Sequence, residues 1–435
     1  MEPTNTQTQT KKREIFGWAM YDVANSAYTT IIITVVFSGF FTSHVVQNEN
    51  IGNSYWGLAI AISCIIALIL SPFVGVISDL SGKKKKYLII STLTCSIFTA
   101  LLYFVGPGDI WLAIGIIAVS NAAWMIGESI CASFLTDISS KKNMGLISGI
   151  GWAVGYLGGL VSLVIVLFVI TKGYKDAPAA QQVIMNQNAM LFTALFFLIA
   201  SLPTFIWVKN KFKPTEKLKT KQILKLGMKR LINFKELIKT YPVLSQFFLA
   251  FTVYMAGYAA IIKFVGIYSK DVLTLSEIQL SIMFVLLQLS AFFGSLLFGF
   301  IDKYIGTKNS ILITLVWWVM GILAIFYIEQ VASILNTDAN TAFTYFALAI
   351  GLALGATQSS SRAVVGILTK AEDSALTFGL WGMFNRTAIL LGMSYGIFAD
   401  MIGLRNALLL IIVFFVIGGL LFLRVDMKKG AEQAQ

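Results

Sequence analysis

Residues 209–239, KNKFKPTEKLKTKQILKLGMKRLINFKELIK, are the longest stretch of this 435-residue chain without an apolar segment of membrane length. The stretch carries eleven Lys/Arg residues and only two acidic ones, Glu216 and Glu236. On both sides of it lie apolar segments of about 20 residues or more, the length that crosses a bilayer as a helix. We expect six such helices before it and six after it, at 15–45, 55–78, 87–106, 110–135, 145–171, 189–208, 242–268, 278–301, 309–328, 342–368, 375–399 and 404–424.

The composition places most of the chain in lipid. It is 57% hydrophobic and only 12% charged, whereas soluble proteins average about 25% charged residues. The formal net charge of +12 could suit a nucleic-acid-binding protein, but the charges lie in short loops between apolar segments. This distribution is typical of proteins that face anionic lipid headgroups, so we expect membrane lipid as a partner and no nucleic acid.

Basic residues are concentrated in alternate loops, and this bias predicts the orientation. With a cytoplasmic N-terminus, 26 of the 33 Lys/Arg residues fall on the cytoplasmic side, where positively charged loops remain during insertion. We therefore expect cytoplasmic tails at 1–14 and 425–435. The basic loop 209–241 fits either an amphipathic helix on the inner leaflet or a solvated linker. The compact loops favour a bacterial inner membrane.

Residues that could support catalysis or bind a metal are scarce. The only histidine, His44, lies at the end of the first segment, and Cys64, Cys95 and Cys131 fall inside apolar segments without CxxC spacing. An enzyme would need a nucleophile with a nearby base, or a cluster of metal ligands. We therefore expect no enzyme, no metal and no cofactor. The lack of a nucleotide-binding motif also argues against ATP as the energy source.

Two related sequences follow the second apolar segment of each half. They are residues 75–84, GVISDLSGKK, and residues 299–308, GFIDKYIGTK. Glycine permits a tight turn, and an aspartate can sit against a helix N-terminus or a nearby cation. A signature repeated at matching places indicates an internal repeat of two six-helix halves. The residues expected to act in conformational change here are Asp79, Gly82, Lys83 and Asp302.

Polar and aromatic side chains share one face of the first predicted helix and of the fourth. A carboxylate inside the membrane is costly unless it faces protein or water. A packing stripe and a cavity-lining stripe both remain open for these faces. Their members are Trp18, Tyr21, Asp22, Asn25, Ser26 and Thr29 in the first helix, and Asn121, Trp124 and Glu128 in the fourth.

The second half places positive charge within the membrane. Arg362 lies in the tenth segment after Gln358, and Arg386 lies about 18 Å into the eleventh helix, close to the bilayer midplane. An arginine at such depth indicates a functional role by default. The seventh segment adds Tyr254 and Tyr258. In the fifth segment, glycines at 151, 155 and 159 form a pattern that lets two helices approach closely, which favours packing over ligand binding.

Three of these stretches together resemble a known family. They are residues 18–28, WAMYDVANSAY, residues 355–362, GATQSSSR, and Phe378-Gly379. They resemble the vacuolar-effluxer-like branch of the major facilitator superfamily, named for a fungal autophagy-related amino-acid exporter. The resemblance implies an all-α, polytopic membrane protein with twelve transmembrane helices in two six-helix bundles, 15–208 and 242–424, and efflux of small solutes. It also implies that Asp79 stabilises the outward-open state by contacting the start of the eleventh helix, near Ser374.

The same resemblance implies that the first, fourth, seventh and tenth helices line a central cavity. Carboxylates from one half and a guanidinium from the other would suit a zwitterion. Arg362 could instead pair with a carboxylate as a cytoplasmic gate, and Arg386 is a second candidate for gating. The expected substrate-binding residues are Tyr21, Asp22, Asn25, Trp124, Tyr254, Tyr258, Gln358 and Arg362.

These features predict a secondary active transporter that moves a small polar or zwitterionic, amino-acid-like solute by alternating access. We expect proton-coupled export by a monomer. Another solute class (drug, sugar, lipid or siderophore) and a passive channel or scramblase remain alternatives.

The expected coupling residues are Asp22 and Glu128. Two carboxylates close together in a low-dielectric setting rarely both stay ionised, so one should hold a proton. We expect Glu128 to carry it, because its neighbours Trp124 and Ile130 are the less polar. Asp22, beside Asn25, should stay ionised and bind the substrate or orient the helix.

Overall fold

The structure is a computed structural model that describes residues 5–212, 219–232, 234–271 and 277–434, and within these ranges it contains helices and no strand. The first half contains α1 (Asn5–Tyr28), α2 (Val36–Phe40), α3 (Glu49–Ser81), α4 (Lys84–Leu101), α5 (Ile110–Ser133), α6 (Leu135–Ile138), α7 (Met144–Ile165) and α8 (Ala179–Trp207). The rest contains α9 (Thr220–Ile232), α10 (Phe234–Thr240), α11 (Pro242–Asp271), α12 (Glu277–Ile305), α13 (Thr307–Phe326), α14 (Ile328–Ile334), α15 (Ala339–Ile367), α16 (Ser374–Gly392), α17 (Ser394–Ile402), α18 (Leu404–Leu423) and α19 (Met427–Gln433).

Eleven helices among the described residues are long and apolar enough to cross a membrane. The first of them joins α1 and α2 through π-helical turns at Thr29–Val35 and Phe41–Val45. The further segment expected at 375–399 is formed by α16 and α17. It is less apolar than the others because it carries Asn385 and Arg386. The all-α, polytopic class expected from the sequence is confirmed.

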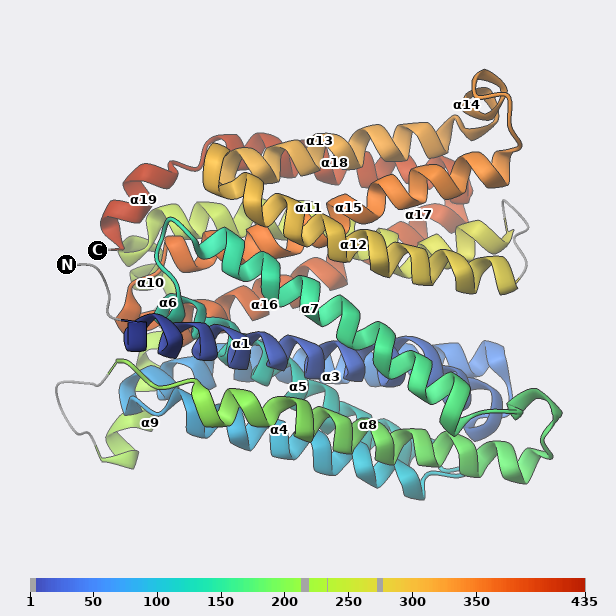
Figure 1. The fold of residues 1–435 in the computed structure, drawn as a ribbon, viewed down its shortest axis with the longest axis horizontal. Coiled ribbons are helices and arrows are strands. Elements are labelled where there is room, and N and C mark those ends of the chain that lie inside the picture. The colour runs from blue at the N-terminus through green and yellow to red at the C-terminus, as the bar shows by residue number, and fades with distance from the viewer. Residues whose placement is uncertain (1–4, 213–218, 233, 272–276, 435) are drawn as a thin grey trace. The chain divides into compact units, whose positions relative to one another are not determined.

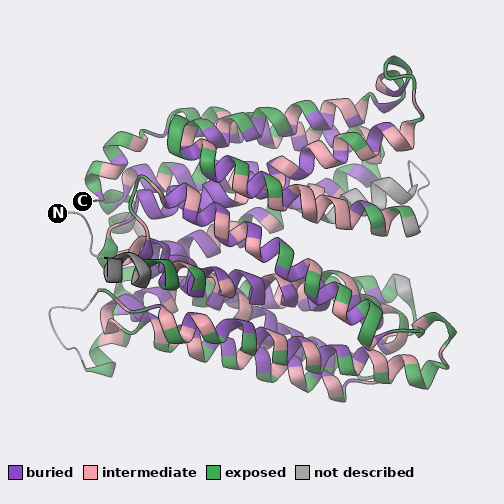
Figure 2. Cartoon of the chain, viewed as in Figure 1, coloured by how far each residue is buried: buried purple, intermediate pink, exposed green. Residues whose placement is uncertain are grey.

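The chain divides into two contact units. In the first, α1, α3, α4, α5 and α8 run side by side, and in the second, α11, α12, α13, α15 and α18 do so (Figure 1). In both, buried residues lie where helices meet and exposed ones on the outward faces and loops (Figure 2). Each unit also includes a segment from the opposite half of the sequence. The first unit is Met1–Ile138, Val154–Leu231 and Glu372–Gly382, and the second is Ser139–Ala153, Ile232–Ala371 and Met383–Gln435.

The segments expected as loop and tails contain helices as well. α9 and α10 occupy much of the basic loop 209–241, of which residues 213–218 and 233 lie outside the described residues. α19 follows the last long helix, and a Cβ at Gly430 would lie 2.8 Å from Val243. The Nζ of Lys308 donates to the carbonyls of Leu423 and Val425, at 2.8 and 2.7 Å, where α18 ends. α19 is therefore docked on the second unit.

Glycines in α7 let it approach α1 within the first unit. A Cβ at Gly155 would lie 3.0 Å from the Ser26 hydroxyl, and a Cβ at Gly158 would lie 2.6 Å from Val23 Cγ1 and 2.8 Å from Val23 Cα. Gly155 and Gly159 of the expected pattern both face α1, since a Cβ at Gly159 would lie 3.3 Å from Ser26 Cβ.

We expect Gly158→Ala to lower the melting temperature of the detergent-purified protein, because the added methyl group overlaps backbone as well as side-chain atoms of Val23. Overpacking of this kind costs about 1–3 kcal/mol. The control is Gly115→Ala in α5, where a Cβ would meet nothing within 4 Å. Equal melting temperatures for the two variants would contradict the close approach of α1 and α7.

Candidate functional site

Asp79, the acidic residue of the first loop signature, binds the first turn of α16. Its Oδ1 accepts a hydrogen bond from the amide of Ala375 (3.1 Å), and its Oδ2 accepts one from the amide of Leu376 (2.8 Å). The first amides of a helix have no partner within the helix and carry partial positive charge, so a carboxylate there is stabilising. Asp79 is 3% exposed, which shields these bonds from water. The expected contact with the start of the eleventh helix is present.

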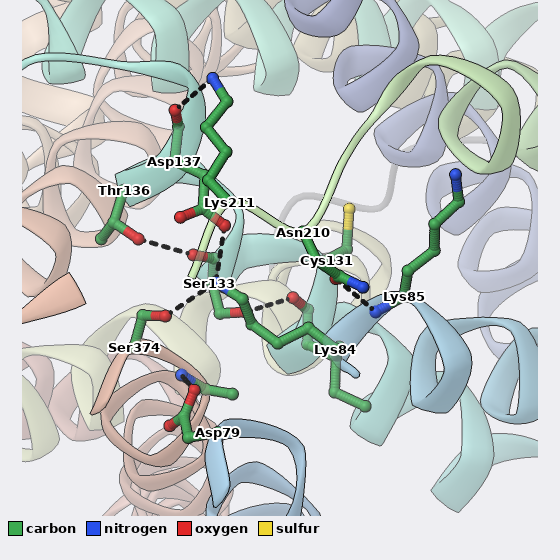
Figure 3. A network of polar contacts seen from close by, with 12 residues as sticks. Asp79, Lys84, Lys85, Cys131, Ser133, Thr136, Asp137, Asn210, Lys211 and Ser374 are labelled. Carbon is green, nitrogen blue, oxygen red and sulfur yellow. Dashed lines mark hydrogen bonds and ion pairs between the residues drawn. The ribbon is translucent and has the colours of Figure 1, made fainter. Parts of the chain in front are cut away.

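Lys84 provides the positive charge of the same cluster (Figure 3). Its Nζ donates to Asp137 Oδ2 (2.6 Å) and to Ser374 Oγ (2.9 Å). The Lys84 and Asp137 side chains are 3% and 4% exposed, so losing one partner would leave the other charge buried. Breaking such a buried pair costs about 3–5 kcal/mol. We call Asp79, Lys84, Asp137 and Ser374 the α16 clasp.

The turn between α3 and α4 decides which lysine enters the clasp. Gly82 ends α3 with φ of 63°, a left-handed conformation that glycine adopts at little cost. Lys83 then lies exposed, whereas Lys84, the first residue of α4, is buried. Lys84 brings a cation to the cluster from the next helix, α4. The motif does not distinguish two adjacent lysines, so Lys84 is a residue that sequence reasoning misses.

The clasp depends on close packing of α3 against the first part of α16. A Cβ at Gly379 would lie 2.6 Å from the carbonyl oxygen of Ser71 and 2.9 Å from Pro72 Cα. A Cβ at Gly75 would overlap the carbonyl of Ala375. Glycine at both places permits this approach, which brings the Asp79 carboxylate to the α16 amides.

The second loop signature builds a related arrangement in the second unit. α7 and α12 approach at glycines, since a Cβ at Gly149 would lie 3.1 Å from Gly299 Cα. Ser360 donates to the Asp302 carboxylate, with distances of 3.2 and 3.1 Å to its two oxygens. The same carboxylate lies against Gly145 in the first turn of α7, where a side chain would overlap it. The two signatures thus place an aspartate beside the first turn of α16 and of α7.

Arg362 on α15 also binds the first part of α7. Its Nε donates to Ser148 Oγ (3.0 Å) and its Nη2 donates to the Ser148 carbonyl (2.9 Å). The guanidinium lies 5.4 Å from the centroid of the Trp152 ring, within the range of a cation–π interaction. Arg362 is 3% exposed, and Arg386 on α16 is 2% exposed. Both predicted arginines are therefore interior groups.

The aromatic residues of α1 pack toward α4 and α5. Tyr21 is fully buried, and its hydroxyl lies 2.9 Å from Thr92 Oγ1. The Tyr28 hydroxyl lies 2.9 Å from Ser120 Oγ, and its ring stacks on Trp124 with centroids 5.9 Å apart. Of these residues Trp124 alone is partly exposed. Tyr21 therefore has the surroundings of a helix-packing residue.

The polar groups of α1 face a different direction from its tyrosines. Asp22 and Asn25 are 9% and 7% exposed, and Glu128 on α5 is partly exposed. Asp22 Cβ lies 3.3 Å from the place where a Cβ of Gly155 on α7 would stand. Asp22 thus lies beside α7, whereas the neighbouring Tyr21 packs against α4.

Two hydrogen bonds fix the register of α1 against α5. Trp18 Nε1 donates to the Cys131 carbonyl at 2.8 Å, and Tyr28 pairs with Ser120. Residue numbers therefore rise along α1 while they fall along α5. At 1.5 Å per residue, Glu128 and Asp22 lie within about 3 Å of each other in depth.

In the second unit the predicted tyrosines are packed among helices. The Tyr254 hydroxyl lies 2.8 Å from Ser361 Oγ, and Tyr254 is fully buried. The Tyr258 ring packs edge-on against Trp318, with centroids 5.9 Å apart. Gln358 is half-buried on α15. Of the three, Gln358 has the most exposed side chain.

A metal site has no basis among the residues that the structure describes. No group of three or more His, Cys, Asp or Glu side chains there could hold an ion. His44 makes hydrogen bonds with Ser43 (2.7 Å) and Gln182 (3.0 Å). His44 therefore lies in the π-helical turn that follows α2, and its side chain contacts α8.

Sequence comparison places the chain among transporters. The family described as vacuole effluxer Atg22 like matches residues 42–435. An uncharacterized MFS-type transporter of Bacillus subtilis (strain 168), YxiO, is 26% identical over 425 residues, which cover 96% of each chain. Autophagy-related protein 22 of Yarrowia lipolytica (strain CLIB 122 / E 150) is 24% identical over 353 residues, 74% of this chain and 57% of that protein.

Solved transporters share the fold. A bacterial homologue of the iron transporter ferroportin in an outward-facing state has a TM-score of 0.70 at 12% identity, over 95% of this chain and 98% of that one. The proton:xylose symporter XylE has a TM-score of 0.70 at 11% identity, over 95% of each chain. The human organic anion transporter MFSD10 has 0.67 at 14%, over 95% and 99%. The chain thus belongs to the vacuole effluxer Atg22-like family, and it is a multi-pass membrane transporter of the major facilitator superfamily rather than an enzyme.

Proposed function

We propose that this transporter exports a small polar or zwitterionic, amino-acid-like solute in exchange for protons. The observation that carries the proposal is the division of interior charge, with carboxylates on α1 and α5 and arginines on α15 and α16. A zwitterion carries both charges: a carboxylate side chain can bind its ammonium group, and an arginine can hold its carboxylate with two parallel hydrogen bonds. The resemblance to a fungal amino-acid exporter supports the same class.

We assign substrate contact to polar and aromatic residues on the predicted faces of α1, α5 and α15. These are Asp22, Asn25, Trp124, Gln358 and Arg362. Tyr21 and Tyr254 are then supporting residues, because each hydroxyl is hydrogen-bonded to a neighbouring side chain. Tyr258 remains a proposed substrate-binding residue, with its ring as the contacting group.

The proposed coupling uses the two carboxylates of the first unit. Glu128 carries the exchanged proton, since its side chain is the more exposed of the two and lies on the same face of α5 as Trp124. Asp22 stays ionised and binds the ammonium of the solute. Competition between proton and solute at this place would link transport to the proton gradient.

The α16 clasp serves as the cytoplasmic lock in this proposal. With both termini in the cytoplasm, α3 ends and α16 begins on the cytoplasmic side. Residues 374–382 of α16 belong with the first unit and its remainder with the second. In this proposal, Asp79 releases the α16 amides when the cytoplasmic side opens. Asp302 and Arg362 hold the start of α7 in the second unit in a similar way, and Arg386 is a further gating residue.

A ligand screen by thermal unfolding tests the proposed solute class. A ligand at about 100 times its Kd stabilises the protein by about 2.7 kcal/mol, which a melting curve detects. We expect at least one neutral amino acid to raise the melting temperature, and Asp22→Asn and Arg362→Gln each to remove that shift. Lys85→Gln is the control outside the site. A shift given only by sugars, drugs or iron chelates would contradict the amino-acid-like class.

A further inference from the structure

The helix α9 in the basic loop rests on the first unit at Gly227. Gly227 stands over the end of α3, where a Cβ would lie 3.6 Å from Val76 and Ile77 and 3.8 Å from Phe73. These are ordinary van der Waals distances, so Gly227 marks the face that packs against the protein. The sequence of α9, TKQILKLGMKRLI, contains no acidic residue.

The remaining faces of α9 combine a row of lysines with exposed apolar side chains. Lys221, Lys225 and Lys229 follow at intervals of four, and the middle one points about 160° away from Gly227 at 3.6 residues per turn. Next to this row lie Leu224 and Met228, which are 44% and 51% exposed. An apolar strip bordered by lysines is typical of a helix that lies in a membrane interface.

The chain itself favours lipid as the partner for this strip. α9 is followed directly by α10 and then by the spanning helix α11, which keeps it near the bilayer. Each lysine near an anionic surface adds a favourable interaction, and long lysine side chains keep their ammonium among headgroups while apolar neighbours enter the acyl region. A helix without acidic residues carries nothing that such a surface repels.

Arg230 connects α9 to the α16 clasp. Its Nη1 donates to Asp373 Oδ1 at 3.0 Å, and Asp373 immediately precedes Ser374 at the start of α16. Arg230 points about 140° away from Lys225, so lipid bound along the lysine row leaves the Asp373 pair in place. The pair is solvent-accessible, with Arg230 47% exposed. An exposed ion pair is weak because holding two long side chains in one geometry costs entropy. The Arg230–Asp373 pair is therefore stronger when α9 is held in place.

We infer that α9 is an interfacial helix that binds anionic lipid of the inner leaflet and, through Arg230 and Asp373, steadies the start of α16. Leu224 and Met228 enter the leaflet, and the lysine row binds the phosphate groups. The inference rests on the cytoplasmic orientation in the proposed function, but it holds for any solute.

The first test measures the depth of α9 in nanodiscs that contain the full chain. The buried cysteines Cys64, Cys95 and Cys131 are replaced by alanine, and an environment-sensitive dye is attached to Met228→Cys. The control is Leu226→Cys, which is also apolar and 40% exposed but lies on the opposite flank. In phosphatidylcholine with phosphatidylglycerol, we expect quenching by brominated acyl chains at 228 and by aqueous iodide at 226. Iodide quenching at both positions, or shielding of 228 from both quenchers by a second protein copy, would overturn the inference.

The second test measures the link to the clasp and needs no transported solute. Ser78→Cys provides a reporter that is fully buried one residue before Asp79. We expect an impermeant maleimide to label it roughly two- to fivefold more slowly with phosphatidylglycerol than in phosphatidylcholine alone, the range that an exposed ion pair supplies. Lys221→Gln, Lys225→Gln and Lys229→Gln together, or Arg230→Gln alone, should remove the lipid dependence. Equal rates in both lipids for the unsubstituted helix would overturn the link, even with α9 at the interface.

Discussion

Replacing Lys84 by methionine should expose the interior end of α3 to water-soluble reagents. Methionine keeps most of the volume but leaves Asp137 as a buried charge without its cation and removes a donor from Ser374. Breaking a buried ion pair costs about 3–5 kcal/mol, and about 1.4 kcal/mol is a factor of ten in an equilibrium. We therefore expect labelling of Ser78→Cys to accelerate at least tenfold.

The neighbouring residue supplies the matched control. Lys85 is partly exposed, and its backbone amide, which methionine retains, donates to Asn210 Oδ1 at 3.0 Å. Lys85→Met should leave the labelling rate within about twofold, as expected of a surface substitution worth less than about 0.5 kcal/mol. Equal labelling of the two methionine variants would show that Lys84 does not hold the clasp. Restoration of slow labelling by Lys84→Arg would support a role of the charge.

Glu128→Gln should abolish gradient-driven accumulation while retaining exchange of labelled for unlabelled solute. Glutamine keeps the shape and hydrogen bonding of a protonated glutamate but cannot release a proton. Asp22→Asn should lose both activities, because the amide cannot offer a negative charge to an ammonium group. Both are measured in proteoliposomes with the amino acid found in the thermal screen. A Glu128→Gln protein that still accumulates solute with the normal pH dependence would contradict the assignment of the proton carrier.

Hydrophobic segments and loop charges predict the fold well, because each spanning helix must satisfy its own backbone within about 20 apolar residues. The family resemblance also implies the contact of Asp79 with α16. Helical spacing predicts the shared face of Asp22 and Asn25. It does not reveal that the neighbouring Tyr21 bonds to Thr92 on α4, since that contact is separated by 71 positions in the sequence.

Contacts between distant helices account for the residues that the sequence does not single out. Lys84 becomes a buried cation only because α4 begins there and Asp137, in the short helix α6 after α5, lies beside it. Ser148 holds Arg362 only because the first part of α7 belongs with the second unit. Such pairings depend on how helices pack, which one chain's periodicity leaves undetermined.

Accumulation of a solute against its gradient tests the central claim most directly. Purified protein is reconstituted into liposomes with an acidic or a neutral lumen, supplied with a pool of isotope-labelled amino acids, and the lumen contents are identified by mass spectrometry. Proton-coupled exchange predicts that the acidic lumen concentrates at least one amino acid above the outside level, whichever way the protein is inserted. A protonophore, Glu128→Gln or Asp22→Asn should abolish this. Amino acids that only equilibrate, with no dependence on the pH difference, would contradict the claim and indicate a passive pathway.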